Sequence, residues 1–379
     1  MIYLDNSATT KPDPSVLKSF DQVTSNFFAN PSSIHQFGGE TEQLLVRTRK
    51  QVAEILKVDK DEVVFTSGGT EGNNTAIKGI ALEHQNRGKH IITSEIEHPS
   101  VLEACHGLEM LGFNITYLPV NQDGIISLQD LEHAIREDTI LISIMHVNNE
   151  IGSIQPIKEV GNIAKQHPKL FLHVDDVQGL GKVPLTLRDS GIDLCSFSGH
   201  KINGLKGTGI LYVNKHTKLF PLLHGGGQEQ SLRSGTENIA GAVAMARALR
   251  LTKEREVQGI KKLYDLQKSL RNALLKITGV KMNTPETAAP HIVNFSMPGV
   301  KPEVIIHMLG EREIFISTKS ACSSKQKDES MVLAACGFNG KRSASGFRVS
   351  MSYDTTAEEI SHFIEALKKA IQQFKEVME

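Results

Sequence analysis

The sequence has 379 residues and a formal net charge of −1; 39% of the residues are hydrophobic and 22% are charged. This balance is typical of a globular protein with room for two domains, and it excludes a global field that attracts nucleic acid or an anionic membrane. The four cysteines (Cys105, Cys195, Cys322 and Cys336) lack the spacing of a disulfide framework, which is typical of a reducing compartment.

The first fifteen residues are a polar arm interrupted by Pro12 and Pro14. They lack the charged and apolar regions of a signal peptide, and no apolar run approaches the ~18 residues of a membrane span. We therefore expect a cytoplasmic protein without contacts to a membrane or direct contacts to nucleic acid.

Helical spacing of apolar residues first occurs at 38–56, and strand-like and helical patterns then alternate. The strand-like runs are 62–66, 90–94, 114–118, 139–147, 170–175, 192–197 and 207–213. Helical patterns between them cover 71–85, 99–111, 127–136 and 157–166. This alternation predicts an α/β fold with a mainly parallel seven-stranded sheet covered by helices.

A long helical pattern at 236–277 predicts a connector between domains or a subunit contact. After it come short strand patterns at 291–297 and 346–352 and helical patterns at 302–309 and 357–377, which indicate a smaller α+β C-terminal domain. We predict a large domain at 15–255 and a small domain built from 1–14 and 256–379.

Ligands of such sheets bind beyond the carboxyl ends of the strands. The first strand is followed by Ser67-Gly68-Gly69-Thr70 and then by a helical pattern. Backbone N–H groups at such a position form an anion cradle; the alternative is a plain turn with Thr70 as helix N-cap. A Walker motif is excluded because no Gly-Lys-Ser/Thr follows.

Three further strand ends carry polar residues. His98 stands before the helix-starting Pro99, where it can stack on a flat ring or move protons, although a lone histidine is more often structural. Asn149 suits either a turn or a ligand oxygen. Asp175 ends a buried strand and needs a partner, such as a protonated ring nitrogen. A metal site from His173 and Asp175 is a minor alternative because no further ligands are suitably spaced, and we predict no metal.

The next strand end carries Lys201. A buried amine can become neutral and hold a carbonyl as a Schiff base, although an ordinary loop lysine is the alternative. Thr236, at the start of the long helical pattern, suits phosphate. Cys322 lies in a small polar segment where its thiolate can meet substrate. Arg348 lies within a strand, where an inward guanidinium needs an anion such as a carboxylate.

These residues together suit a ligand with a phosphate, a ring nitrogen, a ring oxygen and an aldehyde, and a substrate with a carboxylate. Pyridoxal 5′-phosphate with an amino acid meets each requirement. The sequence closely resembles the NifS-like pyridoxal-phosphate-dependent cysteine desulfurases, of the class V aminotransferase family and the aspartate aminotransferase fold type. The resemblance covers essentially the whole chain and is carried mainly by residues 67–71, 97–98, 146–152, 198–201, 233–238 and 320–322.

The resemblance implies a role for each residue around the cofactor ring. Lys201 would hold the cofactor covalently, and Asp175 would pair with the pyridine nitrogen and keep it protonated. Gln178 would bond the phenolic oxygen, and His98 would stack on the ring and move protons. Asn149 would contact the cofactor and the substrate.

The resemblance also implies the binding of phosphate, substrate and sulfur. The cofactor-binding residues at the phosphate end would be Gly69, Thr70, Ser198 and His200. Thr236 would reach the same phosphate from the other subunit of a homodimer. Arg348, with Asn149, would bind the carboxylate of L-cysteine, and Cys322 would be the nucleophile that takes the sulfur.

The implied products are L-alanine and a persulfide on Cys322. The charged residues 325–329 resemble the long-loop branch of the family, whose members pass sulfur to scaffold proteins or tRNA-thiolation enzymes. Iron–sulfur cluster assembly and tRNA thiolation are therefore the expected pathways. The alternatives are a selenocysteine lyase and a weakly active sulfur-relay partner. Asp176 stands where the family commonly has a small residue, and strand alternation predicts that it points away from the ring.

Overall fold

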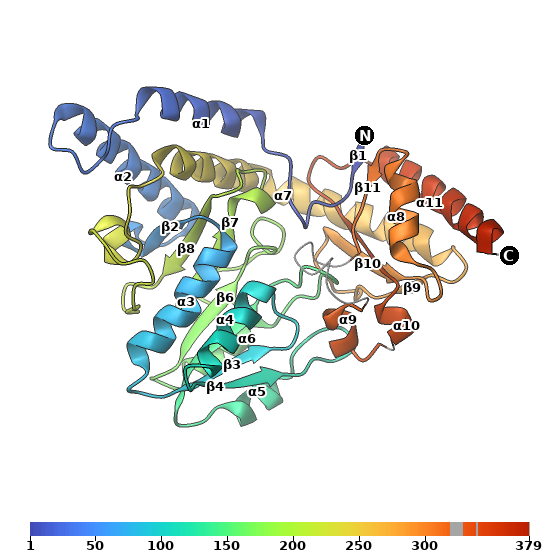
Figure 1. The fold of residues 1–379 in the computed structure, drawn as a ribbon, viewed down its shortest axis with the longest axis horizontal. Coiled ribbons are helices and arrows are strands. Elements are labelled where there is room, and N and C mark those ends of the chain that lie inside the picture. The colour runs from blue at the N-terminus through green and yellow to red at the C-terminus, as the bar shows by residue number, and fades with distance from the viewer. Residues whose placement is uncertain (319–328, 339, 379) are drawn as a thin grey trace.

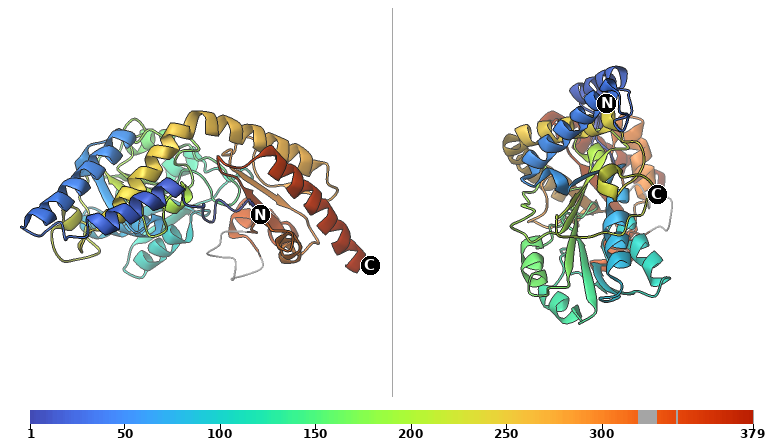
Figure 2. Two further views of the ribbon diagram at one scale, coloured as in Figure 1. Left: turned by 90° about the horizontal axis from the view of Figure 1, so that it is seen from above. Right: turned by 90° about the vertical axis from the view of Figure 1, so that its left-hand side faces the viewer.

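The computed structural model describes residues 1–318, 329–338 and 340–378. The chain forms a larger lobe that contains the N-terminal helices and a smaller lobe near the C-terminus (Figure 1). The long helix α7 (Ile239–Leu275) runs from one lobe into the other, as the view from above shows most clearly (Figure 2). Within the described part of the chain, no helix combines the length and apolar character needed to cross a membrane.

The larger lobe is built on a seven-stranded sheet. Its strands, in spatial order, are β2 (Val63–Thr66), β8 (Gly209–Val213), β7 (Leu194–Ser198), β6 (Phe171–Asp175), β5 (Thr139–Met145), β3 (His90–Ser94) and β4 (Asn114–Leu118). β8 runs antiparallel to both of its neighbours, and all the other pairs are parallel. The predicted α/β fold with a mainly parallel seven-stranded sheet is therefore confirmed.

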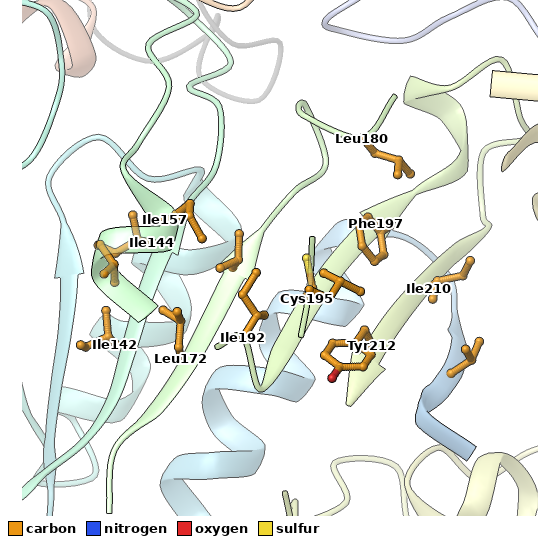
Figure 3. Packing of buried hydrophobic residues seen from close by; sticks show 14 of the residues in the cluster. Ile142, Ile144, Ile157, Leu172, Leu180, Ile192, Cys195, Phe197, Ile210 and Tyr212 are labelled. Atoms are coloured by element: carbon orange, nitrogen blue, oxygen red, sulfur yellow. The ribbon is translucent and has the colours of Figure 1, made fainter. Parts of the chain in front are cut away.

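Helices cover both faces of this sheet, because successive strand residues point to opposite sides. Leu141 packs with α3 (Gly69–His84) and α4 (Pro99–Glu109). Its neighbour Ile142 packs on the other face with α5 (Leu128–Ala134), α6 (Ile157–Ala164) and the first half of α7. Figure 3 shows this second face, with Leu172, Cys195 and Tyr212 on adjacent strands.

Two N-terminal helices, α1 (Pro14–Asn26) and α2 (Gln36–Leu56), pack against α7. The pattern at 38–56 predicts α2, but α1 has no counterpart among the predicted elements. Only Val16 and Val23 of α1 are buried, so its apolar stripe is too sparse to stand out from periodicity. Its start has a local signal, since Asp13 caps the helix and Pro14 occupies its first turn.

The smaller lobe contains a three-stranded antiparallel sheet and a two-stranded parallel one. The strands of the first are β9 (Lys281–Met282), β10 (Ile292–Ser296) and β12 (Gly346–Ser350), and those of the second are β1 (Ile2–Tyr3) and β11 (Ile314–Phe315). The helices are α8 (Pro302–Gly310), α9 (Met331–Ala335), α10 (Gly340–Ser343) and α11 (Ala357–Met378). The N-terminal arm therefore belongs to this lobe through β1.

The domain boundary at 255/256 stays a prediction, and the distribution of core residues along α7 supports it. Met245 and Leu249 pack in the core of the larger lobe. Leu263 and Leu270 pack in the core of the smaller lobe, together with Leu4 from the arm. Between residues 249 and 263, α7 thus passes from the core of the larger lobe to the core of the smaller lobe. This interval includes the predicted boundary.

Candidate functional site

A pocket with about 740 Å³ of open space lies where β2, β3, β5, β6 and β7 reach their carboxyl ends. The predicted site residues that line it are Gly69, Thr70, His98, Asn149, Asp175, Gln178, Ser198, His200, Lys201 and Arg348. The strand-end rule thus places residues from Gly69 to Lys201 in one pocket, and Arg348 joins them from β12 of the smaller lobe. Cys322 lies outside the described residues.

Asp175 provides a buried carboxylate on the α3 side of the sheet. Its Oδ2 accepts a hydrogen bond from Asn73 Nδ2 at 2.7 Å, and its Oδ1 accepts one from the backbone N–H of Val177 at 3.0 Å. These two donors fix the direction of the carboxylate. Asn73 itself was missed in the sequence, although it lies one turn after Gly69 on the helix that borders the pocket.

His98 caps the N-terminus of α4, as its place before Pro99 predicts. Its Nδ1 accepts a hydrogen bond from the backbone N–H of Ser100 at 3.1 Å and lies 2.8 Å from the Ser100 hydroxyl. Burial lowers the pKa of His98, and the Asp175 carboxylate opposes this effect only in part. The ring is therefore neutral near pH 7, with its proton on Nε2.

Lys201 ends the 3₁₀ turn η2 (Gly199–Lys201), which follows β7. Its Nζ donates hydrogen bonds to the backbone oxygens of Ser7 and Ala8, the second at 2.8 Å. Gln178 Nε2 donates to the same Ser7 oxygen at 3.0 Å. The N-terminal arm thus forms one wall of the pocket. The sequence showed no such role for the arm, because backbone carbonyls carry no residue-type signal.

The loop before α3 has the geometry of an anion cradle. α3 starts at Gly69, and Gly68 (φ 148°) is its N-cap. The structure therefore excludes the alternative in which Thr70 is the N-cap; Thr70 lies in the first turn and lines the pocket. A Cβ on Gly69 would lie 2.6 Å from Val177 Cγ2, so the close approach of loop and strand end requires glycine there.

His200 lines the same pocket as this cradle. Burial and the neighbouring Lys201 lower the pKa of His200 to about 4. Its Nδ1 lies 3.3 Å from Thr9 Oγ1. A neutral imidazole at this position can donate one hydrogen bond to an anion without adding a charge.

Arg348 on β12 brings a guanidinium into the pocket from the smaller lobe, and only 1% of it is exposed. Its Nη1 donates to the backbone oxygen of Asn149 at 2.8 Å, and its Nε donates to Ser317 Oγ at 3.1 Å. Its Nη2 donates to Asp5 Oδ1 at 3.0 Å, and this contact is also an ion pair between the guanidinium and the Asp5 carboxylate. Asp5 and Ser317 were missed in the sequence because only the folded chain brings them beside Arg348.

Thr236 lies elsewhere. Its side chain is exposed and is outside the lining that the described residues give the pocket. It was predicted at a helix start, but α7 begins at Ile239 with Asn238 as its N-cap, because the Asn238 side chain accepts a hydrogen bond from Gly241 N–H. Thr236 therefore stands in the non-helical segment before the cap.

Asp176 points to the opposite face of the sheet from Asp175, where it lines a separate cavity with Leu180 and Phe197. Its Oδ1 lies 2.6 Å from His146 Nδ1, and both side chains are buried. Burial raises the pKa of Asp176, while His146 opposes the rise. Asp176 thus has His146 as its own hydrogen-bond partner.

His173, the other candidate metal ligand, has both ring nitrogens engaged. They lie 2.8 Å from Ser143 Oγ and 3.0 Å from Ser196 Oγ, and burial lowers the pKa of the ring to about 3. In the described part of the chain, no group of three or more histidine, cysteine, aspartate and glutamate side chains could hold a metal ion.

The donor set of the pocket fits pyridoxal 5′-phosphate. The Asp175 carboxylate suits a protonated ring nitrogen, and the Gln178 amide suits a ring oxygen. The N-terminus of α3 suits a phosphate. The Lys201 amine suits an aldehyde, and it lies in the same pocket as the other three groups.

Known proteins resemble the chain over nearly its whole length. The family model for aminotransferase class-V matches residues 2–363. The cysteine desulfurase IscS of Dictyoglomus turgidum is 42% identical over 99% of this chain and 96% of that protein. The solved structure of a NifS-like protein superposes with a TM-score of 0.92 at 36% identity, and the match covers 98% of this chain and 99% of that one.

A third relative was solved with an amino acid. The structure of SspA in complex with cysteine is 34% identical, with a TM-score of 0.83, and the match covers 94% of this chain and all of that one. Together these matches confirm the family, the enzyme class and the cofactor that the sequence motifs predict. The chain belongs to the class-V aminotransferase family and, within it, to the pyridoxal-phosphate-dependent cysteine desulfurases of the NifS and IscS type.

Proposed function

We propose that three side chains on different walls of one pocket share the desulfuration of L-cysteine. Asp175 pairs with the ring nitrogen of the cofactor, Lys201 holds its aldehyde carbon, and Arg348 binds the substrate carboxylate. The observation that supports this proposal is that these side chains, from β6, η2 and β12, line a single pocket. When bound, pyridoxal 5′-phosphate supplies an electron sink for the carbons that lose a proton and sulfur.

Asp175 favours a protonated pyridine nitrogen, and the hydrogen bonds from Asn73 and Val177 hold its carboxylate in place. Gln178 bonds the ring oxygen. The phosphate is held by Gly69, Thr70, Ser198 and His200, which line the same pocket.

The Lys201 amine, or alternatively His98, moves the proton from the substrate α-carbon. Burial keeps the His98 ring neutral by lowering its pKa, and because its Nδ1 accepts the Ser100 N–H, its Nε2–H is the group that can donate a proton in the pocket. The Nδ1 of His98 accepts the backbone N–H of Ser100, which fixes the ring plane. A ring fixed in this way can also stack on the cofactor.

Arg348 binds the substrate carboxylate together with Asn149. The guanidinium is already aligned by Asp5, Ser317 and the backbone oxygen of Asn149, so little reordering is needed when substrate arrives. Arg348 has five N–H donors, and those not used by these partners remain for a carboxylate.

Cys322 takes the sulfur as a persulfide. Its thiolate bonds to the substrate sulfur while the bond between that sulfur and carbon breaks. The electron pair stays on the carbon, which takes up a proton to give L-alanine. This role rests on the resemblance of residues 320–322 to the family, and it argues against a selenocysteine lyase, which needs no such thiol.

The persulfide then passes to an acceptor protein of iron–sulfur cluster assembly or tRNA thiolation. A homodimer supports the cofactor site, with Thr236 reaching the phosphate of the partner subunit. The exposed position of Thr236 supports this arrangement. We also propose a cytoplasmic location, for which the buried free thiols of Cys105, Cys195 and Cys336 provide support.

Replacing Cys322 tests the sulfur transfer. With L-cysteine as substrate, Cys322→Ser should lose release of alanine and sulfide by about a hundredfold or more, because a hydroxyl does not replace the nucleophilic thiolate. The visible absorption of the bound cofactor should be unchanged.

The matched control is Cys105→Ser. Burial raises the pKa of the Cys105 thiol to about 12, so that thiol is unreactive and the variant should remain active. Full alanine release by Cys322→Ser would remove Cys322 from the mechanism and favour a simple lyase.

A further inference from the structure

The segment 223–238, here called the Thr236 loop, has an unusual backbone. It contains the 3₁₀ turn η3 (Gln228–Ser231), in which Glu229, Gln230 and Ser231 have φ values of 46°, 59° and 64°. Three consecutive residues with side chains in the left-handed region are unfavourable, and such a backbone persists only where surrounding contacts determine it. These contacts show what the loop is held against.

Glu229 is the main anchor of the Thr236 loop. Its side chain is 4% exposed, and its carboxylate accepts two hydrogen bonds from Arg49 of α2, both of 2.7 Å. The backbone N–H of Phe65 on β2 donates a third hydrogen bond at 2.9 Å. A buried carboxylate with a two-pronged guanidinium and a backbone donor is among the strongest polar contacts available.

A second contact ties the Thr236 loop to the anion cradle. Arg233 Nε donates to Glu71 Oε1 at 2.9 Å, and Glu71 Oε2 accepts the backbone N–H of Ser67, also at 2.9 Å. Phe65 and Ser67 belong to the stretch that leads into the cradle at Gly69. The Thr236 loop is therefore fixed to the cradle of its own chain, while Thr236 itself is exposed.

We propose that Glu229 is a positioning residue that holds Thr236 in place for the cofactor phosphate of the partner subunit. This inference rests on the homodimer of the proposed function. It assigns to Glu229 an effect in the opposite subunit, although the contacts described above join it to its own chain. Arg233 and Glu71 form the second support of the same loop.

Mixed dimers test the direction of this effect. Lys201→Ala removes covalent cofactor attachment from one subunit, so that only the other site gives the visible band. In the first mixed dimer, Glu229→Gln is placed in the Lys201→Ala subunit. In the second, it is placed in the subunit that retains Lys201. The readout is the rate at which bound pyridoxal 5′-phosphate is lost to a carbonyl-trapping hydrazine, followed by absorbance.

We expect the first mixed dimer to lose cofactor about tenfold faster than the dimer without Glu229→Gln, because charge-assisted hydrogen bonds to the loop are lost. The second mixed dimer should lose cofactor at the same rate as the dimer without Glu229→Gln. Faster loss only in the second, equal rates in both, or no change in either would overturn the proposal.

Glu62→Gln is the matched control. Glu62 is also buried and accepts Arg188 Nη2 at 2.7 Å, but it contacts residues 59 and 215 instead of the loop. Its variant should lose cofactor at the original rate from either subunit. If Glu229→Gln fails to fold, Glu229→Asp keeps the charge with a shorter reach and should give a smaller change in the same direction.

The failure of the proposed function would look different. In that case the unaltered protein would be a monomer by mass measurement, or it would show no visible band with pyridoxal 5′-phosphate. An unaltered dimer with stable cofactor that is insensitive to Glu229→Gln overturns only the role of Glu229.

Discussion

Asp175 and Asp176 are adjacent acids that point to opposite faces of one sheet. Asp175 accepts hydrogen bonds from Asn73 and Val177 inside the pocket, whereas Asp176 pairs with His146 behind it. Asp176 therefore has its own hydrogen-bond partner on the face of the sheet away from Asp175. Among the described residues, those that line the cofactor pocket include Asp175 but not Asp176.

Substituting each acid separately tests whether Asp175 alone serves the pocket. Asp175→Asn should keep bound cofactor but reduce alanine formation about a hundredfold, because the amide does not stabilise a protonated ring nitrogen. Asp176→Asn, the matched control, should remain active because its side chain lies outside the pocket. Alanine release and cofactor absorbance measure both effects, and a greater loss of activity in Asp176→Asn would contradict this assignment.

Among the elements, α3 does most to shape the phosphate end of the pocket. Its N-terminus lies close to the end of β6, and Gly72 and Ser196 pack it onto β7. A Cβ on Gly72 would lie 2.9 Å from Ser196 Oγ, so the helix and the sheet approach each other more closely than most residues allow. The position of the cradle is therefore set by how close the helix lies to the sheet.

This close approach can be tested with a pair of substitutions. Gly69→Ala would place a methyl group 2.6 Å from Val177 Cγ2 and force α3 away from the strand end. Affinity for pyridoxal 5′-phosphate should fall about tenfold, since the backbone donors of the cradle move. Adding Val177→Ala removes the obstructing methyl groups and should restore most of the affinity in an absorbance titration. A double variant as weak as Gly69→Ala would count against steric displacement as the cause.

Much of the fold and site could be predicted from sequence because the strands carry long apolar runs and the chemistry stands at their ends. Lys201 and Asp175 were found in this way. Asn73 and Asp5 were missed, because a side chain that acts through another residue shows its role only once the elements are packed. Helix α1 was missed because few of its residues are buried. The start of the long helix was predicted at Thr236 but lies at Ile239, since a helix start depends on which residue caps it.

Across the whole molecule, buried neutral histidines make stability depend on pH. Burial lowers the pKa of His173 to about 3 from 6.5 in the unfolded chain. Between these values the unfolded chain binds more protons, so the free energy of unfolding falls as the pH decreases through 6.5. At pH 5 the loss from this residue is about 2 kcal/mol.

Thermal denaturation at pH 7 and pH 5 measures this dependence. His173→Asn should be less stable at pH 7 but should lose about 2 kcal/mol less on acidification than the unaltered protein. His106→Gln is the control, because the His106 side chain is 52% exposed, and its acid sensitivity should be that of the unaltered protein. An unchanged acid response in His173→Asn would show that other groups dominate.

The N-terminal arm has a consequence for the order in which the chain becomes functional during synthesis. Ile2 pairs with Ile314, and the Asn6 side chain donates to the backbone oxygen of Ser350. At ribosomal speeds of 5–20 residues per second, these partners emerge roughly 15 to 70 seconds after the arm itself. The wall that Ser7 and Ala8 provide beside Lys201 therefore gains its full support only late in translation. Capture of the cofactor at the complete pocket thus waits until residues 2–8 have met partners more than 300 positions later in the chain.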